Sequence, residues 1–141
     1  MSQQNVERLR AGYEAFNSGD LDTALRELHP DIELYVPETA MDAPRPVRGV
    51  DAVRRYLAPD AFAEQRFEPE EFIDHGNIVL VRGRAWVRGR GSGIGLEQTV
   101  FHVWEVREGK AGRLEVHLDR AQAEEAAEHA GSRHYGPQRR S

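Results

Sequence analysis

The chain has 141 residues, with 19 basic and 24 acidic side chains that give a formal net charge of −5 at pH 7. This length suits one domain with a core of its own, and the negative charge disfavours nucleic acid as a partner. The absence of cysteine excludes disulfides, thiolate metal sites and a cysteine nucleophile. The sequence shows neither a signal peptide nor an apolar run of membrane-spanning length, so we expect a cytoplasmic protein with no membrane partner.

The chain is predicted to open with two helices joined by a tight turn. The first helix carries an apolar stripe at helical spacing, formed by Val6, Leu9, Tyr13 and Phe16. The break falls at residues 17–19, where Gly19 can take a positive φ. Asp20 is the predicted N-cap of the second helix, which ends before Pro30.

Strands dominate the rest of the chain. A strand is predicted at 31–36, a proline-rich loop at 37–48 and a short helix at 51–57. Four further strands, each joined to the next by a short turn, are predicted at 67–74, 78–88, 94–107 and 113–119. Consecutive strands with short turns indicate an antiparallel meander.

The C-terminal part of the chain is expected to divide at residue 131. Residues 120–129 are helical by composition, whereas residues 132–141 have little apolar surface to bury and are expected to be disordered. The sequence therefore predicts a single domain over residues 1–131.

This order of elements predicts an α+β fold, in which a curved antiparallel sheet wraps around the N-terminal helices and leaves a cone-shaped cavity. Such a cavity is a common ligand site when it is apolar and a few polar groups converge on it. Four arginines, at positions 82, 84, 88 and 90, form either a phosphate-binding stripe or a solvated outer sheet face. Their alternation with small and apolar residues favours the outer face.

Short motifs at residues 13–22, 49–56, 92–93, 102–104 and 109–110 extend over most of residues 5–130. Their order and spacing resemble the nuclear-transport-factor-2-like superfamily, and most closely its SnoaL-like branch, near the ketosteroid isomerases and polyketide cyclases. The resemblance implies a small-molecule pocket in a superfamily that includes enzymes, binding proteins and assembly modules.

The resemblance can be followed residue by residue. Val36 occupies the place of the isomerases' general base and cannot move a proton, and their oxyanion tyrosine falls at Gly12, one place before Tyr13. The second oxyanion acid of the isomerases aligns with His102, and these three departures argue against ketosteroid isomerisation. In the cyclases an aspartate at the end of the last strand is the acid or base, and Asp119 matches its place.

The last hairpin decides which side chains share a face. If its turn is symmetric about Gly109 and Lys110, then His102 lies opposite His117 and Trp104 opposite Glu115. One face then carries Gln98, His102, Trp104, Glu115, His117 and Asp119. The other carries Phe101, Val103, Leu114, Val116 and Leu118. A slip of one residue would exchange these sets.

Two assignments of the face that lines the cone are compatible with the sequence. The resemblance places His102 inside, which puts the apolar face outside and predicts a homodimer across it. The alternative is that the apolar face forms the core and the polar cluster is solvated.

Asp119 and His102 are the candidate catalytic residues. A partly desolvated histidine could shuttle protons near neutral pH, and a carboxyl group in an apolar pocket could act as an acid. Alternatively, His102 only hydrogen-bonds a ligand or backbone oxygen. A metal site at His102, His117 and Asp119 is disfavoured because their spacing is not a preferred ligand spacing, and no cofactor is expected.

The candidate ligand-binding residues are Tyr13, Tyr56, Trp104, Glu115 and His117, with Tyr56 matching a pocket aromatic of the isomerases. We therefore expect a protein that binds a mainly apolar, polyketide- or steroid-like molecule. As an enzyme it would be a cofactor-free isomerase, cyclase or hydratase that acts by proton transfer. The alternative is a noncatalytic ligand-binding or dimerisation module of the same fold.

Overall fold

The computed structural model describes residues 2–36, 46–57, 62–91, 93 and 95–140. Its elements in chain order are α1 (Ser2–Asn17), α2 (Leu21–Arg26), β1 (Leu28–Tyr35), β2 (Val47–Arg48), α3 (Val50–Leu57), β3 (Phe62–His75), β4 (Ile78–Gly89), β5 (Gly95–Arg107), β6 (Lys110–His117) and α4 (Arg120–Arg140). The mixed α+β architecture with N-terminal helices agrees with the prediction from the sequence.

The junction of α1 and α2 forms as the sequence predicts. Gly19 takes a φ of 86°, and the Asp20 carboxylate accepts from the Thr23 backbone N–H at 3.2 Å. Helix α2 is shorter than predicted, because the Ala111 backbone N–H donates to the Glu27 carbonyl at 2.9 Å and draws the chain into β1 from Leu28 onward.

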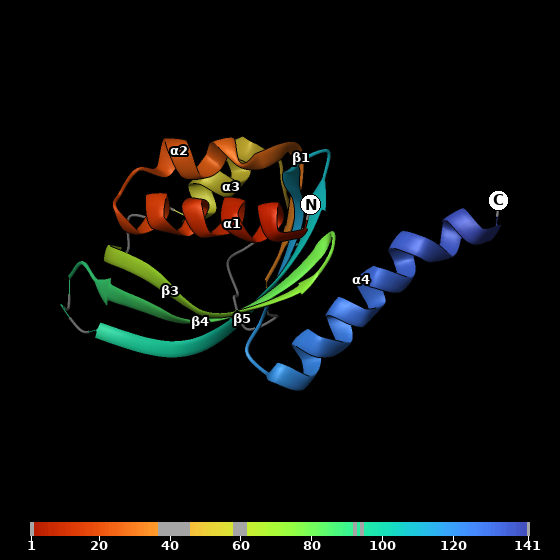
Figure 1. Cartoon of the computed structure of the whole chain (residues 1–141). Helices are drawn as coiled ribbons and strands as arrows, with labels where there is room; N and C mark the ends of the chain where they lie inside the picture. Colours follow the sequence, from red (N-terminus) through yellow and green to blue (C-terminus); the bar gives the residue numbers. More distant parts are fainter. Residues whose placement is uncertain (1, 37–45, 58–61, 92, 94, 141) are drawn as a thin grey trace.

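One six-stranded sheet, in the order β2-β1-β6-β5-β4-β3, bends around α1, α2 and α3 (Figure 1). Strands β3 to β6 form the predicted antiparallel meander, whereas β1 joins β6 in parallel. Of the predicted loop at 37–48, residues 37–45 lie outside the described residues and Val47–Arg48 form strand β2.

The predicted register of the last hairpin is wrong. Its turn consists of Glu108 and Gly109, which take φ values of 53° and 79°, as a type I′ turn requires. The β5–β6 register then shifts between the pairs Glu105–Arg113 and Val106–Ala111, so that Gly112 is the extra residue of a β-bulge.

The corrected register exchanges the faces of β6. His102 lies opposite Val116 and Trp104 opposite Leu114, and these four side chains belong to the inner face. Phe101 lies opposite His117 and Val103 opposite Glu115, on the outer face. Each predicted face therefore mixed residues from both sides of the sheet.

Helix α4 covers part of the outer face. Buried alanines of the helix, Ala123, Ala127 and Ala130, pack with Phe101 and Val103 and with Ile78 and Leu80 of β4. The helix runs on to Arg140 and so includes residues 132–140, for which the sequence predicts disorder. The homodimer was predicted from an apolar outer face that a second copy of the chain would cover. Helix α4 already covers part of this face, and the homodimer itself stays a prediction.

The arginines of β4 pair with carboxylates of the neighbouring strands. Nε of Arg82 lies 3.3 Å from Oε1 of Glu71, and Nη1 of Arg84 lies 3.3 Å from Oε2 of Glu97. Arg88 pairs with Glu64. This pairing agrees with the interpretation of a solvated outer face. None of the helices within the described residues is long and apolar enough to cross a membrane.

Candidate ligand-binding site

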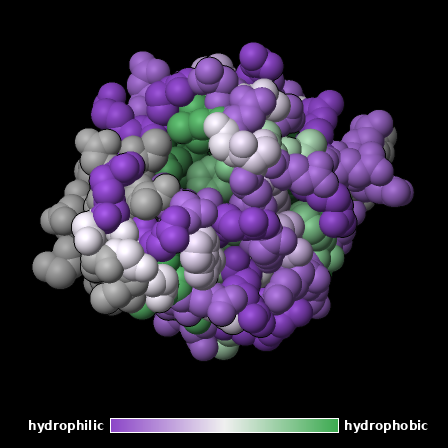
Figure 2. All heavy atoms as spheres, turned by 90° about the vertical axis from the view of Figure 1, so that its left-hand side faces the viewer, coloured by the Kyte–Doolittle hydropathy of each residue, from purple (hydrophilic) through white to green (hydrophobic). Residues whose placement is uncertain are grey.

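The concave face of the sheet and the helices α1, α2 and α3 enclose a chamber of about 290 Å³. Its walls are mostly aliphatic and aromatic side chains, such as Leu9, Leu25, Ile32, Leu34, Val100 and Val116. Figure 2 shows an apolar hollow on the face of the molecule that lies at the left of Figure 1, with hydrophilic residues around it. A chamber of this composition suits a small apolar molecule.

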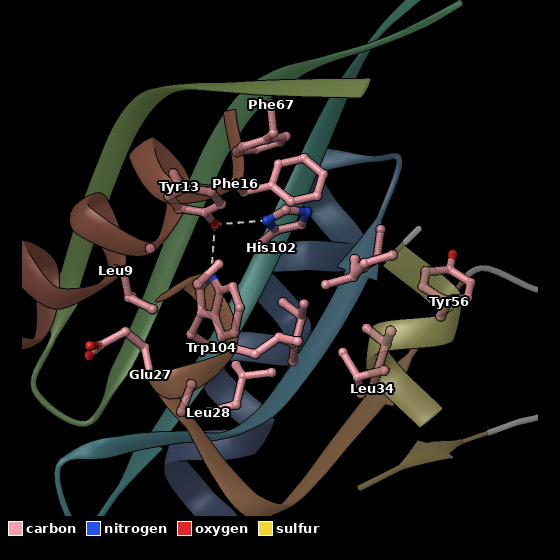
Figure 3. Close-up of a pocket in the computed structure, with 18 of the residues that line it drawn as sticks. Leu9, Tyr13, Phe16, Glu27, Leu28, Leu34, Tyr56, Phe67, His102 and Trp104 are labelled. Carbon is pink, nitrogen blue, oxygen red and sulfur yellow. Dashed lines mark hydrogen bonds between the residues drawn. The ribbon is translucent and has the colours of Figure 1, made fainter. Parts of the chain in front are cut away.

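A chain of hydrogen bonds lies in the wall of the chamber. The Trp104 indole Nε1–H donates to the Tyr13 hydroxyl oxygen at 2.7 Å, and this hydroxyl lies 2.7 Å from Nδ1 of His102. Tyr13 comes from α1 and the other two from β5, so the chain ties the first helix to the centre of the sheet. In Figure 3 the second ring nitrogen of His102 lies on the side away from Tyr13.

Phe67 of β3 stacks over this chain. Its ring centroid lies 4.3 Å from that of His102 and 4.9 Å from that of Tyr13, with interplanar angles of 19° and 28°. The Asn17 side chain fixes the Phe67 backbone, since its amide donates to the Phe67 carbonyl at 2.7 Å and its oxygen accepts from the Phe67 N–H at 2.8 Å. The end of α1 therefore positions the aromatic ring that shields the hydrogen bonds.

Burial keeps Tyr13 and His102, the two titratable groups of the hydrogen-bond chain, neutral. It lowers the pKa of His102 to about 3, so the imidazole carries no charge near pH 7. It also raises the pKa of Tyr13, although the hydrogen bond from Trp104 opposes this shift. Both effects come from the loss of water around the charged forms.

Of the described residues that line the chamber, Arg8, Glu27 and Arg66 are charged, and the two arginines are exposed at its rim. Arg8 is exposed and donates to the Gly109 carbonyl, and Arg66 pairs with Glu68 at 2.6 Å. Within the described residues, no group of three or more His, Asp or Glu side chains is arranged to hold a metal ion.

The comparisons with known proteins agree with this architecture. Residues 9–113 match the model of the SnoaL-like domain. The chain belongs to the SnoaL-like family. An NTF2-like protein of unknown function from Burkholderia pseudomallei is 31% identical, with a TM-score of 0.73 over 84% of this chain and 93% of that one.

Two further solved structures resemble this SnoaL-like chain. TerC, co-crystallised with polyporic acid, is 30% identical, with a TM-score of 0.73 over 89% of this chain and 98% of that one. A proposed SnoaL-like polyketide cyclase from Jannaschia sp. CCS1 is 16% identical, with a TM-score of 0.71 over 84% of this chain and 87% of that one, which shows the fold alone. No curated protein matches the chain.

The SnoaL-like chamber brings together four of the predicted site residues, Tyr13, Tyr56, His102 and Trp104. The other three lie elsewhere. His117 and Glu115 are neighbours on the outer face, 3.2 Å apart. Asp119 is exposed after β6, and its carboxylate accepts from the Gln122 backbone N–H at 3.0 Å as the N-cap of α4. The prediction that these three lie inside the cone is wrong, because it depended on the incorrect register.

Two residues that shape the site were not predicted from the sequence. Phe67 was placed only in a strand, and Asn17 only in a helix break. The signal for Asn17 was weak, because a polar residue directly after the apolar stripe of α1 is also what an ordinary helix end shows. The partner of that amide, 50 positions away, is set by the tertiary fold.

Proposed function

We propose that this SnoaL-like protein binds a mainly apolar, oxygen-bearing small molecule in the chamber, and that His102 contacts the ligand oxygen. One observation carries the proposal. Nδ1 of His102 is engaged by Tyr13, whereas Nε2 has no hydrogen-bond partner among the described residues. A polar nitrogen without a partner in an apolar chamber is the natural place for the oxygen of a ligand.

The relatives support the class of ligand. TerC, at 30% identity, was co-crystallised with polyporic acid. The chamber of the present chain would hold the apolar part of such a molecule against its aliphatic walls. The exposed arginines at the rim, Arg8 and Arg66, lie where they would face an acidic group that reaches the opening.

The chemistry that suits this site is polarisation of a carbonyl group. A hydrogen bond to a carbonyl oxygen stabilises the negative charge that develops there during enolisation. Enolisation is a step shared by cofactor-free isomerisation and aldol-type cyclisation, so we propose such a proton-transfer reaction as the activity. His102 would act as the hydrogen-bond donor.

Noncatalytic binding is the second candidate function. The observation that favours it is that no carboxylate of the described residues hydrogen-bonds to His102. Glu27 is the one carboxylate among the described residues that line the chamber, so an enolisation would have to pass its proton to Glu27 or to a basic group of the ligand itself. Analysis of the ligand recovered after incubation separates the two candidates, because a carrier returns its ligand chemically unchanged.

Binding can be tested by calorimetric titration of polyporic acid into the wild-type protein and two histidine variants. His102→Gln removes the ring nitrogen in the chamber, and we expect about five-fold weaker binding, the equivalent of one net hydrogen bond. His117→Gln is the matched control, since this histidine is the last residue of β6 in the same hairpin but lies on the outer face. Equal affinities for the two variants would contradict the assignment of His102.

A third variant, Asp119→Asn, tests the prediction from the sequence directly. The sequence predicts that this change abolishes turnover, whereas the chamber-based proposal predicts that binding and turnover persist. Native mass spectrometry of the freshly purified protein, searching for a retained small molecule, would supply the true ligand for both measurements.

A further inference from the structure

The hydrogen-bond chain in the chamber wall has a direction that follows from its chemistry. An indole N–H can only donate, a phenol can donate one hydrogen and accept others, and a neutral imidazole has one donor and one acceptor nitrogen. Trp104 therefore donates to Tyr13, as the 2.7 Å contact shows. The remaining question is which way the contact between Tyr13 and His102 runs.

If Tyr13 donates to Nδ1 of His102, every hydrogen of the chain has an acceptor except the one on Nε2. If Nδ1 instead carries the hydrogen, Tyr13 accepts twice and its own hydroxyl hydrogen needs a third partner. Among the described residues the Tyr13 hydroxyl hydrogen-bonds only to His102 and Trp104. The second arrangement therefore leaves a buried hydroxyl hydrogen without an acceptor, which proteins rarely tolerate.

Aromatic side chains surround the Tyr13 hydroxyl and the His102 imidazole. Phe67 stacks on the rings of both Tyr13 and His102, and Trp104 meets the imidazole edge-on at 6.0 Å between ring centroids. Tyr13 is only 7% exposed, so its hydroxyl has little access to water that could replace the missing acceptor. In an apolar wall the direction of a single hydrogen bond has a large effect on the population of each tautomer.

We propose that Trp104, acting through Tyr13, fixes His102 as the tautomer with its hydrogen on Nε2, so that the chamber offers a donor at this point and selects ligands with an acceptor oxygen. The part of this inference that concerns ligands rests on the proposed function. Trp104 is then a positioning residue, because it acts on the ligand through two other side chains. A ketone or quinone oxygen would accept the hydrogen on Nε2 of His102. A ligand that offers an N–H there would place two hydrogens against each other, and no hydrogen bond could form.

The tautomer can be measured in the ligand-free protein. Long-range proton–nitrogen correlation spectra of uniformly ¹⁵N-labelled protein distinguish a ring nitrogen that carries hydrogen from one that does not, and His102→Gln assigns the signals by their loss. We expect Nε2 to carry the hydrogen in the wild-type protein. A hydrogen on Nδ1 would overturn the inference.

Trp104→Phe tests the positioning role. Trp104→Phe removes the indole donor and leaves space beside the Tyr13 hydroxyl for a water that can accept its hydrogen. Tyr13 can then either donate to His102 or accept from it, so both tautomers become populated and the two nitrogen shifts move toward each other. Phe72→Leu is the matched control, because Phe72 packs on the Tyr13 ring, with 6.3 Å between ring centroids, but forms no part of the hydrogen-bond chain. Unchanged shifts in Trp104→Phe would refute the role of Trp104.

Three tricyclic probes of nearly equal shape test the selectivity. Fluorenone offers a carbonyl acceptor, fluorene offers a CH₂ group and carbazole offers an N–H donor. We expect the wild-type protein to bind fluorenone about five-fold more tightly than the other two, and Trp104→Phe to lose most of this preference. Carbazole bound as tightly as fluorenone would overturn the selectivity. If none of the probes binds, the proposed function and the ligand part of the inference fail, while the nitrogen shifts still decide the tautomer.

Discussion

His102 is a polar side chain in a wall that cannot solvate its charged form. Its ring nitrogen Nδ1 is satisfied at 2.7 Å by Tyr13, and the stacked Phe67 covers one face of the imidazole ring. The imidazole is therefore neutral in the folded protein at every pH above about 3, because burial lowers its pKa to about that value. This favours a role as a hydrogen-bond donor over a role as a proton carrier between pH 6 and 8.

The low pKa of His102 also predicts how stability depends on pH. The unfolded chain takes up a proton on this histidine near pH 6.5, whereas the folded chain does so only near pH 3. Its contribution to stability is thus intact above pH 6.5 and is lost as the pH falls toward 3. Between pH 7 and 5 we expect the wild-type protein to lose about 2 kcal/mol more unfolding free energy than His102→Gln.

Urea unfolding at the two pH values measures this difference. Other groups titrate in the same range, but they are common to both proteins and cancel in the comparison. His117→Gln serves as the control, since it removes a histidine from the outer face. If wild type and His102→Gln lose the same stability, His102 is not buried as a neutral group.

At the scale of elements, the contact between α1 and β3 deserves a test because it positions Phe67. The Asn17 amide satisfies both backbone groups of Phe67 across 50 positions of sequence. Asn17→Ala leaves a part-buried N–H and C=O without partners, and we expect a loss of about 2 kcal/mol of unfolding free energy. Ligand affinity should fall as well, because the ring over the hydrogen-bond chain is released.

Ser18→Ala is the matched control for this substitution. The Ser18 hydroxyl donates to the Ala15 carbonyl at 2.9 Å, but the bond is exposed and local. We expect its removal to change the unfolding free energy by less than about 0.5 kcal/mol. Similar losses for the two variants, in urea unfolding at pH 7, would contradict the special role of Asn17.

The elements also show where sequence reasoning succeeds. Local signals predicted the cap at Asp20, the order of the helices and the antiparallel meander, because capping and alternation depend on neighbours in the chain. The faces of the last hairpin could not be predicted, because a single bulge at Gly112 reverses them. Tyr13, Tyr56, His102 and Trp104 line the chamber, and their role in binding stays a prediction, whereas Glu115, His117 and Asp119 were misplaced by this one step.

At the scale of the molecule, the sheet is covered on two sides by different parts of the chain. Helices α1, α2 and α3 close the chamber over the inner face, and α4 crosses the outer face and extends away from it (Figure 1). The small side chains Ala123, Ala127 and Ala130 allow α4 to lie close to Phe101 and Val103. This part of the outer face is thus buried within one chain.

A substitution on α4 tests this arrangement and the predicted homodimer together. Ala123 is fully buried and Ala121 is exposed on the same helix, so Ala123→Asp and Ala121→Asp introduce the same charge in opposite settings. Ala123→Asp places a carboxylate against apolar side chains, and we expect a loss of about 3 kcal/mol in urea unfolding. Ala121→Asp should change stability by less than about 0.5 kcal/mol, since an acidic residue suits the first turn of a helix.

Light scattering on the same proteins reports on their association. If α4 detaches from the sheet in Ala123→Asp, Phe101 and Val103 form an exposed apolar surface through which molecules associate. The average mass should then rise with protein concentration. A wild-type dimer that persists unchanged in Ala123→Asp would place the interface away from α4. A wild-type dimer that dissociates in this variant would place α4 itself at the interface. Equal stability and equal mass for the two variants would show that α4 does not cover the outer face.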